Sequence, residues 1–193
     1  MAEPENLEDI SEEPTEYIPT PDEYGGNSMR IPKIAKVIVN FAVGQSGIPL
    51  ERAKKVCEQL TEQSSIETRA KQTIREFGIR QGEPIACKAT LRGVRAESFL
   101  EKALIAKNKT LRARNFDTYG NFSFGIEEHI DVPGTRYDPD VGVIGFEVSV
   151  TMERPGYRVK MRRYRPKKIP MTHKLTKDES IHYISKKYDV LIE

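Results

Sequence analysis

Four segments of the chain alternate between apolar and polar residues, as expected of strands that bury only one face. They are residues 34–43, 85–91, 122–126 and 143–152. In the first segment Val37 and Phe41 lie on one side of the expected strand, whereas Lys36 and Asn40 lie on the other. Strands of a fully covered parallel sheet are apolar on both sides, so this pattern favours an antiparallel or mixed sheet with one open face.

Three further segments repeat apolar residues at helical spacing. The first begins at Pro49 and ends near Gln63, and the second covers residues 96–104. The third follows a capping box that runs from Thr176 to Glu179. Helices of this kind bury one stripe against a sheet, so the sequence predicts an α+β fold with helices packed on one face of the sheet.

Charge divides the chain at residue 28. Residues 1–28 hold nine acidic residues and neither Lys nor Arg, and they show no apolar periodicity. This composition predicts a disordered acidic extension, which is a solvated spacer in the favoured interpretation and a mask for basic surface in the other. Residues 29–193 hold all 31 basic residues against 20 acidic ones, a net charge of +11. We expect them to form a single α+β domain.

The densest cationic stretch is residues 154–168, a basic C-terminal extension with eight basic side chains in fifteen residues and no acid. Such a run repels itself and is neutralised by a polyanion, so RNA is its expected partner. A solvated charged surface is the alternative, and its tyrosines either stack on unpaired bases or pack against the sheet. The candidate RNA-contacting residues are Arg154, Tyr157, Arg158, Lys160, Arg162, Arg163, Arg165, Lys167 and Lys168.

Two other regions are candidate RNA-binding surfaces. Residues 68–82 are polar and cationic, and exposed loops of this length are usually functional, although a mobile surface loop fits the residues equally well. The outward side of the strands is the second region, where polar side chains can bond ribose hydroxyls or base edges. Its candidate residues are Lys36, Asn40, Lys88, Thr90 and Arg92.

Signals for catalysis are weak. The three histidines are scattered, and Cys57 and Cys87 have no metal-ligand spacing, so we expect no enzyme, metal or cofactor. Two cysteines without a disulfide framework, and no apolar run of membrane-spanning length, predict a soluble cytoplasmic protein without a membrane partner. An RNA-modifying enzyme with a basic RNA-binding surface is the alternative function, and a DNA-binding regulator is a weaker one.

Five stretches together resemble one protein family. They are residues 31–40, 69–74, 77–93, 120–126 and 137–139. In this order they are similar to the large-subunit ribosomal protein that binds 5S rRNA, the universal L five family, in its archaeal form. The resemblance covers essentially all of residues 29–193, and the basic run that follows Arg154 is similar to the archaeal and eukaryotic branch.

The resemblance implies an RRM-like α+β sandwich that holds 5S rRNA in the central protuberance of the large subunit. It also implies contacts with large-subunit rRNA, with P-site tRNA and with neighbouring ribosomal proteins, one of them in the small-subunit head. Residues 131–140 would lie near that intersubunit edge. By position, the implied 5S rRNA-binding residues are Asn40, Gln63 and Thr90, with Thr68, Arg69 and Arg92 nearby. The implied tRNA-facing loop contains Lys71, Gln72, Thr73, Arg75, Phe77 and Arg80.

Two features depart from the family pattern. The family often has Gly before the glutamine, and here Glu62 occupies that position. A carboxylate beside a phosphate is costly, which weakens the role implied for Gln63. The acidic extension is the second departure, because such chains usually begin near Met29.

Overall fold

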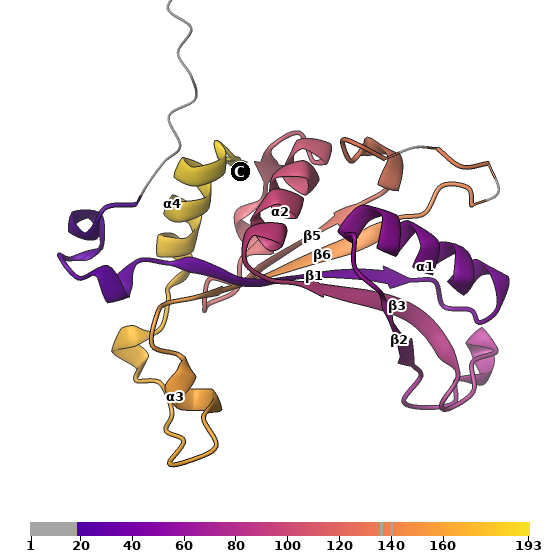
Figure 1. Ribbon diagram of the computed structural model, residues 1–193, viewed down its shortest axis with the longest axis horizontal. Helices are drawn as coiled ribbons and strands as arrows, with labels where there is room; N and C mark the ends of the chain where they lie inside the picture. The colour runs from indigo at the N-terminus through magenta and orange to yellow at the C-terminus, as the bar shows by residue number, and fades with distance from the viewer. Residues whose placement is uncertain (1–18, 136, 140) are drawn as a thin grey trace, which may run out of the picture.

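The computed structural model describes residues 19–135, 137–139 and 141–193. Five strands form one antiparallel sheet in the order β2-β3-β1-β6-β5, and the helices α1, α2 and α4 lie together on one side of it (Figure 1). The sheet strands are β1 (Lys33–Ala42), β2 (Ile66–Arg69), β3 (Pro84–Leu91), β5 (Phe122–Ile126) and β6 (Phe146–Glu153). The predicted α+β fold with helices on one face is confirmed.

The remaining elements are shorter or lie at the sheet's periphery. The helices are α1 (Ile48–Thr61), α2 (Val94–Ala106), α3 (Arg158–Met161) and α4 (Lys177–Tyr188). Two short parallel strands, β4 (Thr110–Leu111) and β7 (Leu191–Ile192), pair with each other. Single 3-10 turns occupy Pro21–Tyr24, Ser28–Arg30, Arg75–Phe77, Ala113–Asn115, His129–Asp131 and Met171–His173.

The core lies between the sheet and the three long helices. Alternate residues of β1, namely Val37, Val39 and Phe41, are fully buried, as the alternation predicts. The ring of Phe41 stacks on that of Phe146 from β6, with their centroids 5.0 Å apart. Cys57 and Cys87 are buried as free thiols. Because the long strands bury apolar side chains on one face, the opposite face of the sheet is free to carry polar side chains.

Helix α4 begins at the predicted capping box. The Thr176 side chain accepts a hydrogen bond from Glu179 N, and the Glu179 carboxylate accepts one from Thr176 N. Both bonds satisfy amides that the first turn of a helix leaves without intrahelical partners. Ile184 and Tyr183 of this helix are buried in the core.

Strand β6 begins later than the sequence predicts, at Phe146 instead of residue 143. Ile144 exchanges hydrogen bonds with His129: its N–H donates to His129 Nδ1 and its carbonyl accepts from His129 N. These bonds replace the strand ladder at this point. A side chain at Gly145 would lie 2.8 Å from the Glu127 carbonyl oxygen, so the backbones also approach closely here.

The sequence does not predict β2, whose end covers the start of the expected loop 68–82. Ile66 is its one large apolar residue, and that side chain is 66% exposed. A four-residue edge strand that buries little apolar surface shows no alternation to recognise.

The prediction of disorder does not hold for residues 19–28. They form the first two 3-10 turns (Figure 1). Tyr24 is buried, and the Glu23 carboxylate lies 3.1 Å from Lys186 Nζ of α4. The rest of the predicted extension, residues 1–18, lies outside the described residues. Within the described part of the chain, no helix is long and apolar enough to cross a membrane.

Candidate nucleic-acid interface

The strand register places the predicted polar residues side by side on the sheet face that the helices leave uncovered, here called the open face. Asn40 of β1 lies opposite Lys88 of β3 on one side and opposite Glu147 of β6 on the other. Two residues earlier, Ile38 lies opposite Thr90 and Ser149 in the same way. The predictions for β1 and β3 therefore converge on one surface.

The open face is polar and shallow. Ser123, Gly125 and Ser149 add little bulk on its β5 and β6 side, and the amide of Asn40 lies 3.5 Å from the Glu147 carboxylate. Lys88 and Arg92 are exposed, while Lys36 and Thr90 are half-buried. Hydroxyls and an amide between cations can bond ribose and phosphate across a flat surface.

Residues 155–174 project from the open-face side of the sheet and are here called the basic arm. Within it, Arg162 Nε donates to the Arg165 carbonyl (2.9 Å) and Lys167 N donates to the Val159 carbonyl (3.1 Å), which folds the arm back on itself. Its exposed cations are Arg158, Lys160, Arg162, Arg163, Arg165, Lys167 and Lys168. Because these side chains are exposed to solvent, they are accessible to the phosphates of an RNA.

Two residues of the predicted basic run lie at the base of the arm and support it. Arg154 is only 3% exposed, and its Nη2 lies 2.5 Å from Glu179 Oε1 of α4. Tyr157 is half-buried, its ring centroid lies 6.0 Å from that of His173, and burial raises its pKa. Arg154 is therefore buried at the base of the arm, and Tyr157 packs beside His173.

The loop between β2 and β3, residues 70–83, is a second projection. Ile74 and Ile79 pair as a short bridge, and Gln81 N donates to Thr73 Oγ1 (3.0 Å). Phe77 at the tip is 71% exposed. The predicted tRNA-facing residues Lys71, Gln72, Thr73, Arg75, Phe77 and Arg80 are all exposed.

Glu83 holds the base of this loop. Its Oε1 accepts from Ser46 Oγ (2.5 Å) and its Oε2 accepts from Arg80 N (2.9 Å). These bonds to Ser46 and to the Arg80 amide lower the pKa of the Glu83 carboxyl. The carboxylate thus ties the loop to the turn that follows β1.

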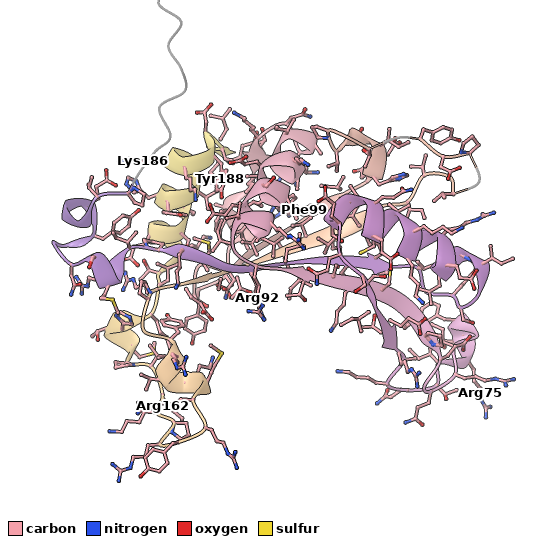
Figure 2. The ribbon with its side chains drawn as sticks, in the orientation of Figure 1. Arg75, Arg92, Phe99, Arg162, Lys186 and Tyr188 are labelled. Carbon is pink, nitrogen blue, oxygen red and sulfur yellow. The ribbon has the colours of Figure 1, made fainter. Side chains whose placement is uncertain are left out.

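The two projections flank the open face. Figure 2 shows Arg162 on the basic arm and Arg75 on the β2–β3 loop at opposite ends of the molecule, with Arg92 pointing from the sheet into the space between them. All three lie on the side away from α1 and α2 (Figure 2). The result is a concave surface with cations at both ends and polar groups across its floor.

Three other predicted residues lie in or just before the edge strand β2. Gln63 is exposed in the turn between α1 and β2, where it follows Glu62 in a left-handed conformation (φ 50°). Thr68 of β2 pairs with Ala86 of β3, and Arg69 ends the strand. Thr68 is thus on the same sheet as Asn40, whereas Gln63 belongs to the helix-side connection.

Sequence reasoning assigned no function to a polar groove beside β5. Its volume is about 730 Å³, and three basic and three acidic residues line it, namely Lys107, Arg112, Arg114, Glu127, Glu147 and Glu193. The available signal was the density of charge, since residues 107–114 contain four basic residues and no acid. The groove extends the polar surface past the last strand.

The loop that the family resemblance places at the intersubunit edge is described in part. Val132 and Val141 are buried and anchor its ends, while Asp131 and Tyr137 are exposed. Positions 136 and 140 lie outside the described residues. Among the described side chains there is no cluster of His, Cys, Asp or Glu that could hold a metal ion.

Comparison with known proteins agrees with this architecture. The model of the ribosomal L5 family C-terminus matches residues 84–183, and the model of ribosomal protein L5 matches residues 27–80. The large ribosomal subunit protein uL5 of Methanosphaera stadtmanae is 48% identical over 167 residues, which are 86% of this chain and 99% of the relative. That of Methanococcus maripaludis is 52% identical over 164 residues, which are 83% and 91%. The chain belongs to the ribosomal protein L5 family.

Proposed function

We propose that this protein is a structural constituent of the large ribosomal subunit that binds 5S rRNA across its open face. The observation that carries the proposal is the concave arrangement of the basic arm, the open face and the β2–β3 loop on one side of the sheet (Figure 2). Its family membership supports the ribosomal setting, because the relatives are named large ribosomal subunit proteins. A structural role replaces the alternative of an RNA-modifying enzyme.

The proposed division of labour follows the chemistry of each part. Exposed cations of the arm neutralise phosphates, which supplies affinity without sequence information. Asn40, Thr90 and Ser149 on the floor offer an amide and hydroxyls to ribose 2′-hydroxyls and base edges, which fix the register of the RNA. Attachment of 5S rRNA to the central protuberance then follows from binding large-subunit rRNA as well, for which the groove beside β5 is the candidate.

The β2–β3 loop is the proposed contact with P-site tRNA. Its tip carries Arg75 and the exposed ring of Phe77, far from the arm (Figure 2). A cation and an aromatic ring at the end of a projection can reach a second RNA without leaving the first. Residues 131–140 remain the proposed contact with a protein of the small-subunit head.

Binding to purified 5S rRNA, measured against a structured RNA of equal length over a range of salt concentrations, tests the central proposal. We expect tighter binding to 5S rRNA. Replacing Arg158, Arg162 and Arg163 together by Glu removes three phosphate-binding cations. The slope of log K against log salt should then fall by roughly 2–3 in magnitude, at about 0.9 per phosphate contact.

A charge-matched control lies on the opposite side of the molecule. Arg52 and Lys55 of α1 and Lys102 of α2 are exposed on the helix-covered side, and their replacement by Glu changes the net charge equally. We expect this control to keep most of the slope. Equal losses in both variants, or equal binding to both RNAs, would show that net charge and not the concave surface governs binding.

A further inference from the structure

A pocket of about 600 Å³ lies where the basic arm joins the sheet. The segment before β5, the end of β6 and both limbs of the arm contribute to it. Its volume falls within the ~300–1,000 Å³ of sites that hold small molecules. The residues that matter most for its chemistry are Tyr119, Glu153, Tyr157, Lys160, Lys168 and Met171.

Aromatic and apolar side chains form part of its lining. The Tyr119 ring is 46% exposed, and Met171 is 71% exposed. Tyr157 is held in place by His173, whose Nε2 lies 2.8 Å from the Pro155 carbonyl oxygen and whose ring tilts against the tyrosine. Flat apolar surface that stays exposed at a pocket is suited to stacking a planar ring.

Three lysines also line the pocket. Lys160 and Lys168 line the pocket from the arm, and Lys174 lines it with its Nζ 4.5 Å from the Tyr119 ring centroid. Phosphate is the anion that an exposed cluster of ammonium groups on an RNA-binding arm attracts. A ring-stacking surface beside phosphate-binding cations has the chemistry of a nucleotide site.

We infer that this pocket holds one unstacked base of RNA, with the phosphate of that nucleotide among the three lysines. The inference rests on the proposed RNA-binding function, because the arm must reach RNA for a base to enter. It adds a base-specific contact to a surface whose other cations recognise only the backbone. Unpaired bases of loops and bulges are the ones that proteins stack on aromatic side chains.

The polar lining favours guanine. Asn121 is already engaged, since its amide donates to Asp117 Oδ2 (2.9 Å) and its Oδ1 accepts from Met152 N (3.2 Å). Glu153 remains as the carboxylate of the pocket, and an ionised carboxylate only accepts hydrogen bonds. Guanine presents N1–H and N2–H side by side on its pairing edge, whereas uracil presents a single N–H there.

Methyl NMR of the full chain, labelled with ¹³C at the methionine methyl groups, tests the site with guanosine 5′-monophosphate as the probe. Met152 and Met171 line the pocket, while Met161 is exposed on α3 outside it. We expect the probe to shift the Met171 and Met152 signals and to leave Met161 in place. Ribose 5-phosphate, which lacks the base, should not shift Met171.

Two tyrosine variants form a matched pair. Tyr119→Ala should weaken binding of the probe about five-fold or more, the loss of one stacking contact. Tyr164→Ala removes an equally large ring that is 73% exposed on the basic arm outside the pocket lining, so the affinity should stay unchanged. Glu153→Gln should reduce the preference for guanosine over uridine 5′-monophosphate.

The outcomes separate the two proposals. A chain that binds 5S rRNA through its arm but shows no Met171 shift at the highest soluble probe concentration overturns the pocket inference alone. Equal loss of probe affinity in Tyr119→Ala and Tyr164→Ala overturns it too, because binding would then be general to the arm. If reversal of the arm's charges leaves 5S rRNA binding unchanged, the proposed function is contradicted, and the pocket inference that rests on it is contradicted as well.

Discussion

The guanidinium of Arg154 lies between the end of β6 and the first turn of α4, where it is buried and forms an ion pair with Glu179. Glu179 also closes the capping box through its second oxygen, which accepts from Thr176 N at 3.0 Å. The Glu179 carboxylate therefore neutralises a buried cation and caps the N-terminus of α4. Loss of either partner leaves a charge or an amide without compensation.

Replacing Glu179 by Ala should lower the free energy of unfolding by about 3 kcal/mol, because a buried guanidinium loses its partner and the helix loses its cap. Urea denaturation measures the change. Asp178→Ala is the matched control, since Asp178 is exposed in the same turn and interacts mainly with the helix dipole. It should cost about 0.3–1 kcal/mol. Equal costs would show that the Arg154 pair contributes nothing.

Glu62 occupies the position at which the family resemblance implies a glycine. It caps the C-terminus of α1 in the left-handed region, with φ 50° and ψ 28°, and its N–H donates to the Glu58 carbonyl. A side chain is strained there, whereas glycine adopts this conformation at little cost. The acidic residue therefore costs stability as well as placing a carboxylate beside Gln63.

Glu62→Gly should raise the free energy of unfolding by about 0.5–1 kcal/mol, as relief of strain exceeds the added chain entropy of glycine. Thermal unfolding should show a Tm higher by roughly 1–4 °C. Glu62→Ala separates charge from backbone: it removes the carboxylate but keeps the strained Cβ, so it should bring no such gain. A gain of equal size with alanine would mean that charge was the cause.

At the scale of elements, the β2–β3 loop depends on Glu83 for its attachment. The pKa of this carboxyl is lower in the folded protein than its ordinary value of 4.5. Its stabilising bonds are therefore fully present above that ordinary value, and they are lost as the pH falls through the lower folded pKa. Acid should release the loop from the turn at Ser46 while the core stays folded.

Hydrogen exchange at the Arg80 amide, corrected for its intrinsic rate, should show protection that falls as the pH drops below about 4.5. Glu83→Gln should lower the protection at neutral pH and remove its pH dependence. Glu76→Gln changes an exposed acid near the loop tip and should retain the dependence. If the native loop keeps its protection at acidic pH, Glu83 does not hold it.

Elements differ in how far the sequence predicts them. Strands β1 and β3 are predicted because each buries alternate side chains, and that alternation also assigns Asn40 and Thr90 to one face. How close these two residues lie depends on the register between β1 and β3, and the alternation within a single strand does not specify that register. Strand β2 has no buried face to reveal it. From the sequence alone, Arg154 is predicted to be an exposed cation like its neighbours, because the residue that neutralises it, Glu179, lies 25 positions away along the chain.

At the scale of the molecule, the acidic N-terminal region is not uniform. Residues 19–28 contact the folded body, since Tyr24 is buried and Glu23 pairs with Lys186 of α4. The boundary suggested by charge, at residue 28, thus lies beyond residues that contact the folded body. Composition averages over a window and therefore misses one tyrosine that contributes to the fold.

This boundary leads to different expectations for two shortened chains. A chain that begins at Pro19 keeps every described contact and should keep its Tm. A chain that begins at Met29 loses the buried Tyr24 ring, which costs about 2 kcal/mol, or roughly 4–8 °C in Tm for a protein of this size. Circular dichroism during heating measures both, with Tyr24→Ala in the full chain isolating the contribution of the ring. Equal Tm values for the two shortened chains would place residues 19–28 outside the cooperative fold, and the acidic region would then act only through its charge.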